Sequence, residues 1–482
     1  MQGRNARFDF TSEVPGLETL GRVHFIAIGG SGMSAVARIM LARGVVVSGS
    51  DAKDSAVLET LRGLGATITV GHDPAHVEGV DTVVISSAIP ETNVELAAAR
   101  VAGCLVLHRS QGLAATMKDA RPAAVAGANG KTTTTSMLTV ALQAAGLDPS
   151  FASGGELAGQ GTNAAWGSGD VFVVEADESD GSFLVYRPEV AIVTNVQPDH
   201  LDFYGTFDNV EAAYAEFAES LRSGGLLVAC ADDAGSERLA ARASAAGTRV
   251  LTYGFDATAD LRLADHRADD EGIGTTTVLH RSGGDSVTLR LATPGSHNAL
   301  NAAAAYLAAT EGFGAHSTRV LDGLAEFDGA RRRFEIRGDV AGVTVVDDYA
   351  HNAGKVAAVV ATAAEIAGRR GGRLLVAFQP HLYSRTRDFA GGFAAGLAPA
   401  DTVVLLDIYG AREQPAEGIT SELIAAPLRE LPGERSVTVG GSFESIAADL
   451  AAEAQPGDLV LTVGAGDVTA LASHVLRALE ER

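Results

Sequence analysis

Short apolar runs that end in Gly, Asp or Asn recur along the whole chain. Examples are "RVHFIAIGG" (22–30), "RPAAVAG" (121–127), "DVFVVEAD" (170–177), "RLLVAFQ" (373–379) and "DLVLTVGAG" (458–466). Continuous apolar runs of this length are typical of strands that are buried on both faces. Ala- and Leu-rich segments with helical periodicity lie between many of them. The pattern therefore predicts a βαβα alternation, with parallel sheets that are covered by helices.

Two changes in this pattern predict the domain organisation. The stretch from about 255 to 292 contains "TTTVLHRSGGDSVTLRL", which indicates short antiparallel strands. A new α/β region begins around "FDGARRRFEIRG". The chain has 482 residues, which is enough for roughly three domains. We therefore expect domains at 1–117, 118–329 and 330–482.

Composition narrows the choice of partners. The apolar content of 46% is ordinary for a soluble globular protein, and the net charge of −23 argues against nucleic acid as a partner. Small anionic ligands can still bind at loops and helix ends. Cys104 and Cys230 form no C-x-x-C pair, so neither a disulfide framework nor a cysteine metal site is indicated. No secretory h-region or long apolar run is visible, so we expect a cytoplasmic protein without a membrane partner. As a separate expectation, the protein is a monomer or a weak homodimer.

A glycine-rich turn follows the first apolar run. Gly30-x-Gly32-x-x-Ala35 matches the dinucleotide-binding fingerprint in its G/A form, and Asp51 lies 19 residues after Gly32. Glycines at these positions allow a sharp turn and bring phosphate groups close to a helix N-terminus. By itself the motif is compatible with a nicotinamide or flavin enzyme, with another nucleotide ligand, or with a turn that binds nothing.

The stretch "GANGKTTTT" has the setting of a phosphate loop, because an apolar strand precedes it and a helical pattern follows. The usual spacing G-x-x-x-x-G-K-[ST] would place the first glycine at Val125, but it stands at Gly127. The chain has 33 Arg and only four Lys, so Lys131 in this loop is informative. Lys131 would bind terminal phosphates, and the hydroxyl of Thr132 or Thr133 would ligate Mg²⁺. A Thr-rich helix start without a ligand is the alternative.

Polar clusters follow two further strands of the same region. "EADESD" (175–180) supplies four acidic residues, and "QPDHLD" (197–202) supplies Asp199, His200 and Asp202. The carboxyl ends of parallel strands share one edge of a sheet, so both loops should lie near the phosphate loop. Carboxylate and imidazole groups there could hold Mg²⁺ against a phosphate. Taken alone, an acidic loop is usually solvated and a lone histidine is usually structural.

Later segments also carry candidate polar residues. "PGSHNALN" (294–301) begins a helix, where Ser and Asn are good caps, and "GARRRFE" (329–335) places three Arg together, which suits phosphate as well as a solvated face. "VVDDYAH" (345–351) and "FQPHLYSRTRDF" (378–389) mix His, Tyr, Asp and Arg after apolar runs. No Ser-His-Asp order or Gly-x-Ser-x-Gly elbow is present in the sequence, so a hydrolase nucleophile is not indicated.

In their joint order these segments resemble one family, the Mur ligases, which are ATP-dependent, amide-forming ligases of peptidoglycan precursor synthesis. The resemblance spans residues 22 to 470 and rests on "HFIAIGGSGMS", "SSAIP", "GANGKTTTT", "EADESD", "TNVQPDHLD", "PGSHNALNAAAA", "RRF", "DDYAH", "FQPHLYSRT" and "GAGD". It implies an α/β fold with a Rossmann-like N-terminal domain, a central P-loop ATPase-like domain and a Rossmann-like C-terminal domain. It also implies a short phosphate loop that begins at Gly127, and a first domain that holds the UDP of the substrate.

The resemblance implies a role for each matching residue, with ATP and Mg²⁺ as cofactors. The implied catalytic residues are Lys131, Glu175 and His200, and the implied metal ligands are Thr132, Glu175 and His200. The implied ATP-binding residues are Gly127, Asn129, Gly130, Lys131, Thr132, Thr133, Asn298, Arg333 and Asp348. The implied substrate-binding residues are Gly30, Ser31, Gly32, Ser87, Arg109, His351 and Arg385. The branch with the greatest resemblance joins L-alanine to UDP-N-acetylmuramate through an acyl phosphate.

The sequence departs from the usual pattern of that branch at three places. Ala128-Asn129 stands where Thr-His is usual, Asn352-Ala353 where His-Pro is commoner, and Leu382 where Arg is frequent. These departures concern amino-acid specificity more than the ATP chemistry.

Three other functions are left open by the sequence. A recycling ligase that adds a tripeptide to the same nucleotide would share the ATP motifs. A nicotinamide oxidoreductase is supported by the first glycine motif and Asp51, but it leaves the central loop unexplained. A non-catalytic relative would bind the UDP-sugar without turnover. No Lys lies between Lys131 and Lys355, which excludes the carbamylated lysine of several sister ligases and favours the alanine-adding branch.

Overall fold

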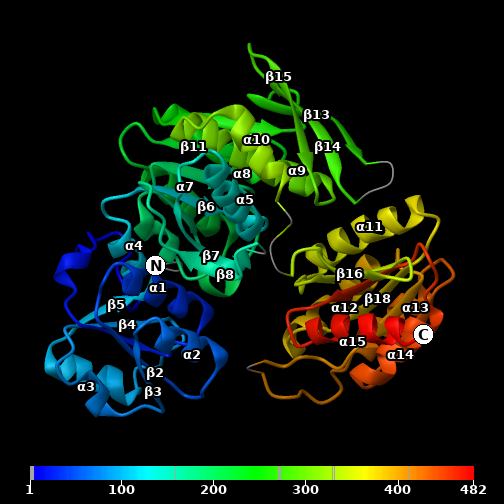
Figure 1. Cartoon of the computed structure of the whole chain (residues 1–482), viewed down its shortest axis with the longest axis horizontal. Coiled ribbons are helices and arrows are strands. Elements are labelled where there is room, and N and C mark those ends of the chain that lie inside the picture. Colours follow the sequence, from blue (N-terminus) through cyan, green and yellow to red (C-terminus); the bar gives the residue numbers. More distant parts are fainter. Residues whose placement is uncertain (1–4, 158, 270–272, 328, 330–331, 412) are drawn as a thin grey trace. The chain divides into compact units, whose positions relative to one another are not determined.

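A computed structural model describes residues 5–157, 159–269, 273–327, 329, 332–411 and 413–482. The described residues form three sheets with helices on their faces, which confirms the α/β class (Figure 1). The first two sheets belong to one compact unit, and the third belongs to a second unit that consists mainly of Gly329–Arg482. The boundaries after residues 117 and 329 stay predictions. Within the described ranges no helix is long and apolar enough to cross a membrane.

The first sheet has five parallel strands in the order β3-β2-β1-β4-β5. This is a Rossmann-like order, in which the strand sequence reverses between β1 and β4, so the loops after these two strands flank a switch point where ligands bind in open α/β sheets. The strands are β1 (Val23–Ile26), β2 (Val47–Asp51), β3 (Thr67–Val70), β4 (Thr82–Ile85) and β5 (Leu105–His108), and the helices are η1 (Leu17–Thr19), α1 (Ser31–Ala42), α2 (Ala56–Gly63), η2 (Pro74–Val77), α3 (Val94–Ala102) and α4 (Arg109–Thr116).

The second sheet has ten strands in the order β15-β14-β13-β12-β11-β10-β6-β9-β7-β8. Strand β6 lies between β9 and β10 and runs parallel to both, and each of the three is a continuous apolar run buried along most of its length. The strands are β6 (Arg121–Ala126), β7 (Ser150–Leu157), β8 (Thr162–Ala165), β9 (Val171–Glu175), β10 (Val190–Val193), β11 (Leu226–Cys230), β12 (Arg249–Gly254), β13 (Leu261–Ala268), β14 (Thr275–Arg281) and β15 (Ser286–Leu291).

Strands β13, β14 and β15 pair antiparallel, which confirms the change of pattern expected between about 255 and 292. Helices α5, α9 and α10 pack together against this sheet (Figure 1). The helices of the region are α5 (Lys131–Ala144), η3 (Ser182–Tyr186), α6 (Leu201–Tyr204), α7 (Phe207–Glu219), α8 (Ala234–Ala245), α9 (Ser296–Leu307), the π-helical turn η4 (Ala308–Gly312) and α10 (Ser317–Ala325).

The third sheet has six strands in the order β16-β17-β21-β18-β19-β20, parallel except for the β16–β17 pair. Its inner strands β18 and β21 are buried along their whole length, as their apolar runs predict. The strands are β16 (Glu335–Val340), β17 (Val343–Asp348), β18 (Leu374–Phe378), β19 (Thr402–Leu405), β20 (Ser436–Val439) and β21 (Leu459–Val463), and the helices are α11 (Ala353–Arg369), α12 (Tyr383–Leu397), α13 (Glu422–Glu430), α14 (Phe443–Glu453) and α15 (Thr469–Glu480).

Candidate functional site

The short glycine loop between β6 and α5 has a backbone that only glycine accommodates well. Gly127 has φ +137°, and a Cβ atom there would lie 2.0 Å from Thr194 Oγ1. Gly130 has φ +86°, and a Cβ atom there would lie 2.6 Å from Asn301 Oδ1. Both glycines are therefore required by close packing as well as by positive φ. Helix α5 begins directly after Gly130, so its first N–H groups face the loop in the way that anion sites require.

Lys131 is the first residue of α5, and its ammonium is held inside the loop. Its Nζ donates to the carbonyl oxygen of Gly127 at 2.6 Å and to Glu178 Oε1 at 2.9 Å. Desolvation by burial lowers the pKa of Lys131, but the carboxylates of Glu178 and Glu175 raise it by more, so the net pKa is raised. Lys131 is therefore positively charged at neutral pH and lies where a phosphate on the loop would need a cation.

Thr132 and Glu175 form the part of the site that suits a divalent cation. The Thr132 hydroxyl donates to Glu175 Oε1 at 3.0 Å, and the backbone N–H of Gly154 donates to Glu175 Oε2 at 2.6 Å. A hydroxyl beside a carboxylate is an oxygen donor set that Mg²⁺ accepts when phosphate oxygens complete it. Among the described residues no group of three or more His, Cys, Asp or Glu is arranged to hold a metal ion.

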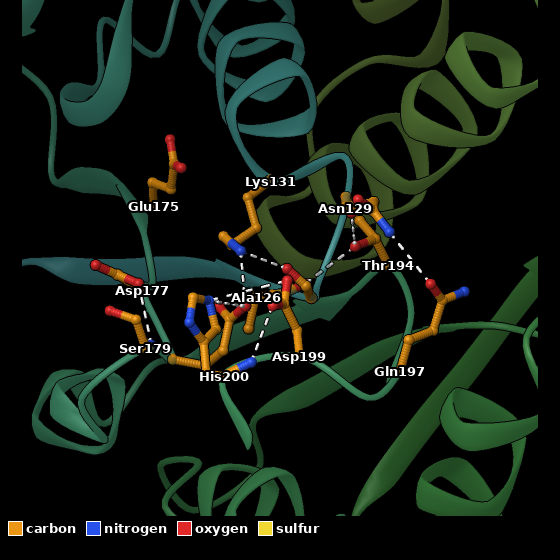
Figure 2. A network of polar contacts seen from close by, with 12 residues as sticks. Ala126, Asn129, Lys131, Glu175, Asp177, Ser179, Thr194, Gln197, Asp199 and His200 are labelled. Atoms are coloured by element: carbon orange, nitrogen blue, oxygen red, sulfur yellow. Dashed lines mark hydrogen bonds and ion pairs between the residues drawn. The ribbon is translucent and has the colours of Figure 1, made fainter. Parts of the chain in front are cut away.

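His200 reaches the same region from the loop after β10. It is the N-cap residue of the short helix α6, with φ +52°, and its Nε2 lies 3.9 Å from Glu178 Oε1 and 3.9 Å from Asp199 Oδ2. Figure 2 shows Lys131 and His200 within one network of polar contacts. The sequence predicted that these loops meet at one sheet edge, and the structure brings Lys131, Glu175 and His200 there.

The loop after β10 also forms hydrogen bonds with the glycine loop between β6 and α5. Asn195 Oδ1 accepts the backbone N–H of Asn129 at 2.9 Å, and Thr194 Oγ1 donates to the Asn129 carbonyl at 2.5 Å. The Asn129 side chain donates to Gln197 Oε1 at 3.2 Å (Figure 2). Asn129, which departs from the usual Thr-His, therefore connects two loops of the site. Thr133 is half-buried on α5.

Asn298, on the first turn of α9, is buried in the same unit.

The loops at the switch point of the first sheet contact the acidic loop 176–181. Arg109 Nη2 donates to Asp177 Oδ2 at 2.9 Å, and its Nη1 lies 3.0 Å from the position of a Cβ atom on Gly32. Ser87 Oγ donates to Asp180 Oδ2 at 2.6 Å. Gly32 thus lies beside Arg109, and both Arg109 and Ser87 contact the acidic loop.

The remaining glycine-loop residues lie beside them. Gly30 directly precedes α1. The side-chain amide of Asn163 donates a hydrogen bond to the carbonyl oxygen of Ser31 at 3.2 Å. Asp51 accepts the backbone N–H of Gly29 at 2.9 Å, so this acid orders the glycine turn itself.

Two predicted ATP-binding residues lie in the second unit. Arg333 lies over the ring of Tyr349, with 5.4 Å from its Cζ to the ring centroid. Asp348 is buried and accepts the backbone N–H groups of Phe334 and Ala350 at 2.8 and 2.7 Å. Burial raises the pKa of Asp348, although Arg333 opposes this. Asp348 therefore orders the backbone directly after Arg333 and directly after Tyr349.

The two predicted substrate residues of this unit contact each other. Arg385 Nη1 donates to the His351 carbonyl at 3.3 Å, and burial lowers the pKa of His351 to about 4, so the imidazole is neutral at pH 7. The two departures nearby have structural consequences. Asn352 caps α11, because its Oδ1 accepts the Lys355 N–H at 2.9 Å. Leu382 has φ +71°, a strained value for a non-glycine residue.

Sequence reasoning missed the part that Glu178 plays. It treated the acidic run 175–180 as uninformative by itself, yet Glu178 is the buried carboxylate that contacts Lys131. One signal could have pointed to Glu178. It lies three residues after Glu175, in the loop that follows β9, and β9 is the neighbour of β6 in the sheet, so this loop lies near Lys131.

Three family models match successive parts of the chain. Residues 22–121 match the model "Mur ligase family, catalytic domain", residues 125–309 match "Mur ligase middle domain", and residues 332–466 match "Mur ligase, glutamate ligase domain". The chain is 55% identical to a UDP-N-acetylmuramate–L-alanine ligase of Kineococcus radiotolerans over 97% of this chain and 98% of that protein. It is 52% identical to the enzyme of the same name from Saccharopolyspora erythraea over 96% of this chain and 94% of that protein.

Solved structures agree with this result. The crystal structure of a UDP-N-acetylmuramate–alanine ligase from Thermotoga maritima matches with a TM-score of 0.78 and 28% identity, covering 95% of this chain and 99% of that chain. A murein peptide ligase from Psychrobacter arcticus shares the fold, with a TM-score of 0.66 and 24% identity over 96% of this chain and 99% of that chain. With three matching models in order and relatives of this identity over nearly its full length, the chain belongs to the Mur ligase family, with that family's three-domain architecture.

Proposed function

We propose that this protein joins L-alanine to UDP-N-acetylmuramate and converts ATP to ADP and phosphate. Two relatives that are named UDP-N-acetylmuramate–L-alanine ligase are 55% and 52% identical to this chain over nearly its whole length. The observation that carries the proposal is the short glycine loop, in which the Lys131 ammonium and the Thr132–Glu175 pair lie together at the start of α5. Such a loop serves phosphoryl transfer, which the first step of amide ligation requires.

The reaction proceeds through an acyl phosphate. An oxygen of the lactyl carboxylate attacks the γ-phosphorus of ATP, the bond to the β-phosphate oxygen breaks, and ADP leaves. The amine of L-alanine then attacks the acyl carbon, the carbon–nitrogen bond forms, the bond to the phosphate oxygen breaks, and inorganic phosphate leaves. One proton is lost from the nitrogen. No protein nucleophile is needed, so catalysis rests on alignment and on charge stabilisation.

In this scheme each part of the loop has its own task. The N–H groups at the start of α5 bind phosphate oxygens, with Gly127, Asn129 and Gly130 shaping the turn. Lys131 would neutralise the β- and γ-phosphates, and His200 would contact the terminal phosphate. Thr132 and Glu175 would hold Mg²⁺ together with phosphate oxygens, and Thr133 would contribute next to Thr132. When bound, the metal neutralises charge that develops on the transferred phosphoryl group. His200 is a weaker candidate ligand, because Mg²⁺ prefers oxygen.

The remaining predicted roles are part of the same proposal. Gly30, Ser31 and Gly32 would hold the UDP diphosphate, with Ser87 and Arg109 on the opposite side of the switch point. Asn298 would contact the adenine side of ATP. Arg333 and Asp348 would serve ATP, and His351 and Arg385 would serve the muramate or the amino acid. The domain boundaries, the cytoplasmic location and the oligomeric state stay predictions.

Phosphate release tests the proposal directly. The protein would be supplied with ATP, Mg²⁺ and UDP-N-acetylmuramate, and with L-alanine, D-alanine, glycine or the tripeptide L-alanyl-γ-D-glutamyl-meso-diaminopimelate in separate reactions. We expect release that depends on L-alanine, and a product heavier than the nucleotide by one alanyl residue in mass spectrometry. Release with the tripeptide only would assign the recycling reaction instead. No release with any acceptor would refute a ligase function.

A further inference from the structure

The Glu178 carboxylate lies between the two residues that the proposed function places at the terminal phosphates of ATP. Its Oε1 lies 2.9 Å from Lys131 Nζ and 3.9 Å from His200 Nε2, and its side chain is 2% exposed. Its backbone is held as well, because Tyr204 Oη donates to the Glu178 carbonyl at 2.6 Å and the Gly181 N–H donates to it at 3.1 Å. Lys131 and His200 therefore share one fixed, buried anion.

The second oxygen of this carboxylate is unusual. Glu178 Oε2 is buried and has no hydrogen-bond partner among the residues that the structure describes. A buried carboxylate oxygen without a hydrogen bond lowers the stability of the folded protein. A glutamate at this position therefore needs an explanation other than packing. Burial raises the pKa of Glu178, although Lys131 opposes this. A structural role alone would be served as well by an uncharged side chain.

The hydrogen-bond geometry of Lys131 gives a reason. An ammonium has three N–H donors, and here one goes to the Gly127 carbonyl and one to Glu178 Oε1. Within the described part of the chain these two acceptors fix the long side chain and leave one donor for a phosphate oxygen. A lysine held in this way does not have to be ordered when ATP binds, so the loop is pre-organised.

We propose that Glu178 is a positioning residue for the ATP site: it holds the Lys131 ammonium against the loop, charged and with one donor free, and it orients His200 from the other side. This inference rests on the proposed phosphate-binding role of Lys131. The other groups that interact electrostatically with this carboxylate are Asp177 on the same loop, Tyr204 on α6 and Tyr214 on α7. Glu175, the last residue of β9, interacts with Lys131, and Asp199 Oδ2 lies 3.9 Å from His200 Nε2.

The variant Glu178→Gln tests the proposal, because it keeps the shape and an acceptor oxygen but removes the charge. We expect kcat to fall about 10- to 100-fold, as for the loss of a charge-assisted hydrogen bond. The KM for ATP should stay within about threefold of wild type, because removal of a negative charge favours phosphate binding while looser positioning of Lys131 opposes it. The KM for L-alanine should not change.

Partial rescue by a conservative variant separates positioning of Lys131 from a merely structural role. Glu178→Asp keeps the charge but shortens the reach to Lys131, so its kcat should lie between those of Glu178→Gln and wild type, although Gln matches the shape of Glu more closely. The matched control is Glu189→Gln, which removes the carboxylate that pairs with Arg121 at 2.7 Å outside the site. That control should leave kcat and the KM for ATP unchanged.

Each outcome decides the proposal. Wild-type kcat in Glu178→Gln would overturn it, and so would a lower kcat in Glu178→Asp than in Glu178→Gln, because the shape and not the charge would then matter. A large rise in the Mg²⁺ concentration needed for half-maximal rate would also overturn it, since Glu178 would then be a metal ligand. If Glu178→Gln does not fold, Glu178→Asp decides alone, and its kcat should be below wild type with the KM for ATP within about threefold. Failure of the proposed function would show differently, as absence of phosphate release by the wild-type protein.

Discussion

Replacing Lys131 with methionine removes the ammonium and keeps an unbranched stem of similar length. In the wild-type structure Nζ donates to the Gly127 carbonyl at 2.6 Å and to Glu178 Oε1 at 2.9 Å. The variant leaves a carboxylate that is 2% exposed without its cation. Breaking a buried ion pair by removing one partner costs about 3–5 kcal/mol, because the remaining charge is uncompensated. Lys131→Met should therefore destabilise the protein as well as inactivate it.

The destabilisation should depend on pH in a defined direction. Burial raises the pKa of Glu178 above 4.5 even with Lys131 present, and loss of Lys131 removes the main opposing effect. An acid whose pKa is higher in the folded state than in the unfolded state makes stability fall as pH rises from the unfolded value through the folded value. Each unit of difference corresponds to about 1.4 kcal/mol. The variant should thus be close to wild type near pH 5 and clearly less stable at pH 8.

Two assays check this prediction, with Lys118→Met as a matched control because Lys118 pairs with Glu13 on the surface at 3.5 Å. Thermal unfolding should give a lower Tm for Lys131→Met at pH 8 and a smaller difference at pH 5. Phosphate release should fall by about 10²–10³ or more, the loss expected when one charge-stabilising group is removed. An equal loss of Tm at both pH values would refute the buried-charge reasoning. Turnover near the wild-type rate would refute the phosphate-loop assignment.

Three further predictions concern other parts of the first unit. Gly127→Ala would place a Cβ atom 2.0 Å from Thr194 Oγ1 at a φ of +137°, so the loop would have to change its shape. ATP binding measured by calorimetry should then be lost, while binding of the UDP-sugar should be unchanged. Unchanged ATP affinity would show that this loop does not bind ATP. Arg109→Ala should raise the KM for UDP-N-acetylmuramate about 10- to 100-fold and leave the KM for ATP nearly unchanged, and equal effects on both would contradict a diphosphate role. Burial alone would raise the pKa of Glu95, but hydrogen bonds from three histidines and a serine lower it to about 2 from 4.5. Its contribution of about 3 kcal/mol is therefore present above pH 4.5 and lost as pH falls toward 2, so acid unfolding of Glu95→Gln should show a flatter pH dependence than wild type.

Local pattern was enough for much of the fold and for part of the site. Continuous apolar runs such as β6 and β21 predict strands buried on both faces, because no polar side of such a strand could face water. Loops that follow parallel strands share one sheet edge, which is why Lys131, Glu175 and His200 could be expected near one another. The antiparallel region that contains β13, β14 and β15 was visible as a change from apolar runs to alternation.

The sequence by itself determined the α/β class, the strand and helix pattern, the glycine loop before Lys131 and the sheet edge at which that loop lies, since these depend on residues near one another in the chain. Only the tertiary structure decided that β6 lies between β9 and β10, that Glu178 rather than its acidic neighbours binds Lys131, and that Asp177 pairs with Arg109. Four carboxylates in one short loop are alike in sequence. Which of them is buried and paired depends on backbone directions that are set by contacts 47 and 68 residues away in the chain.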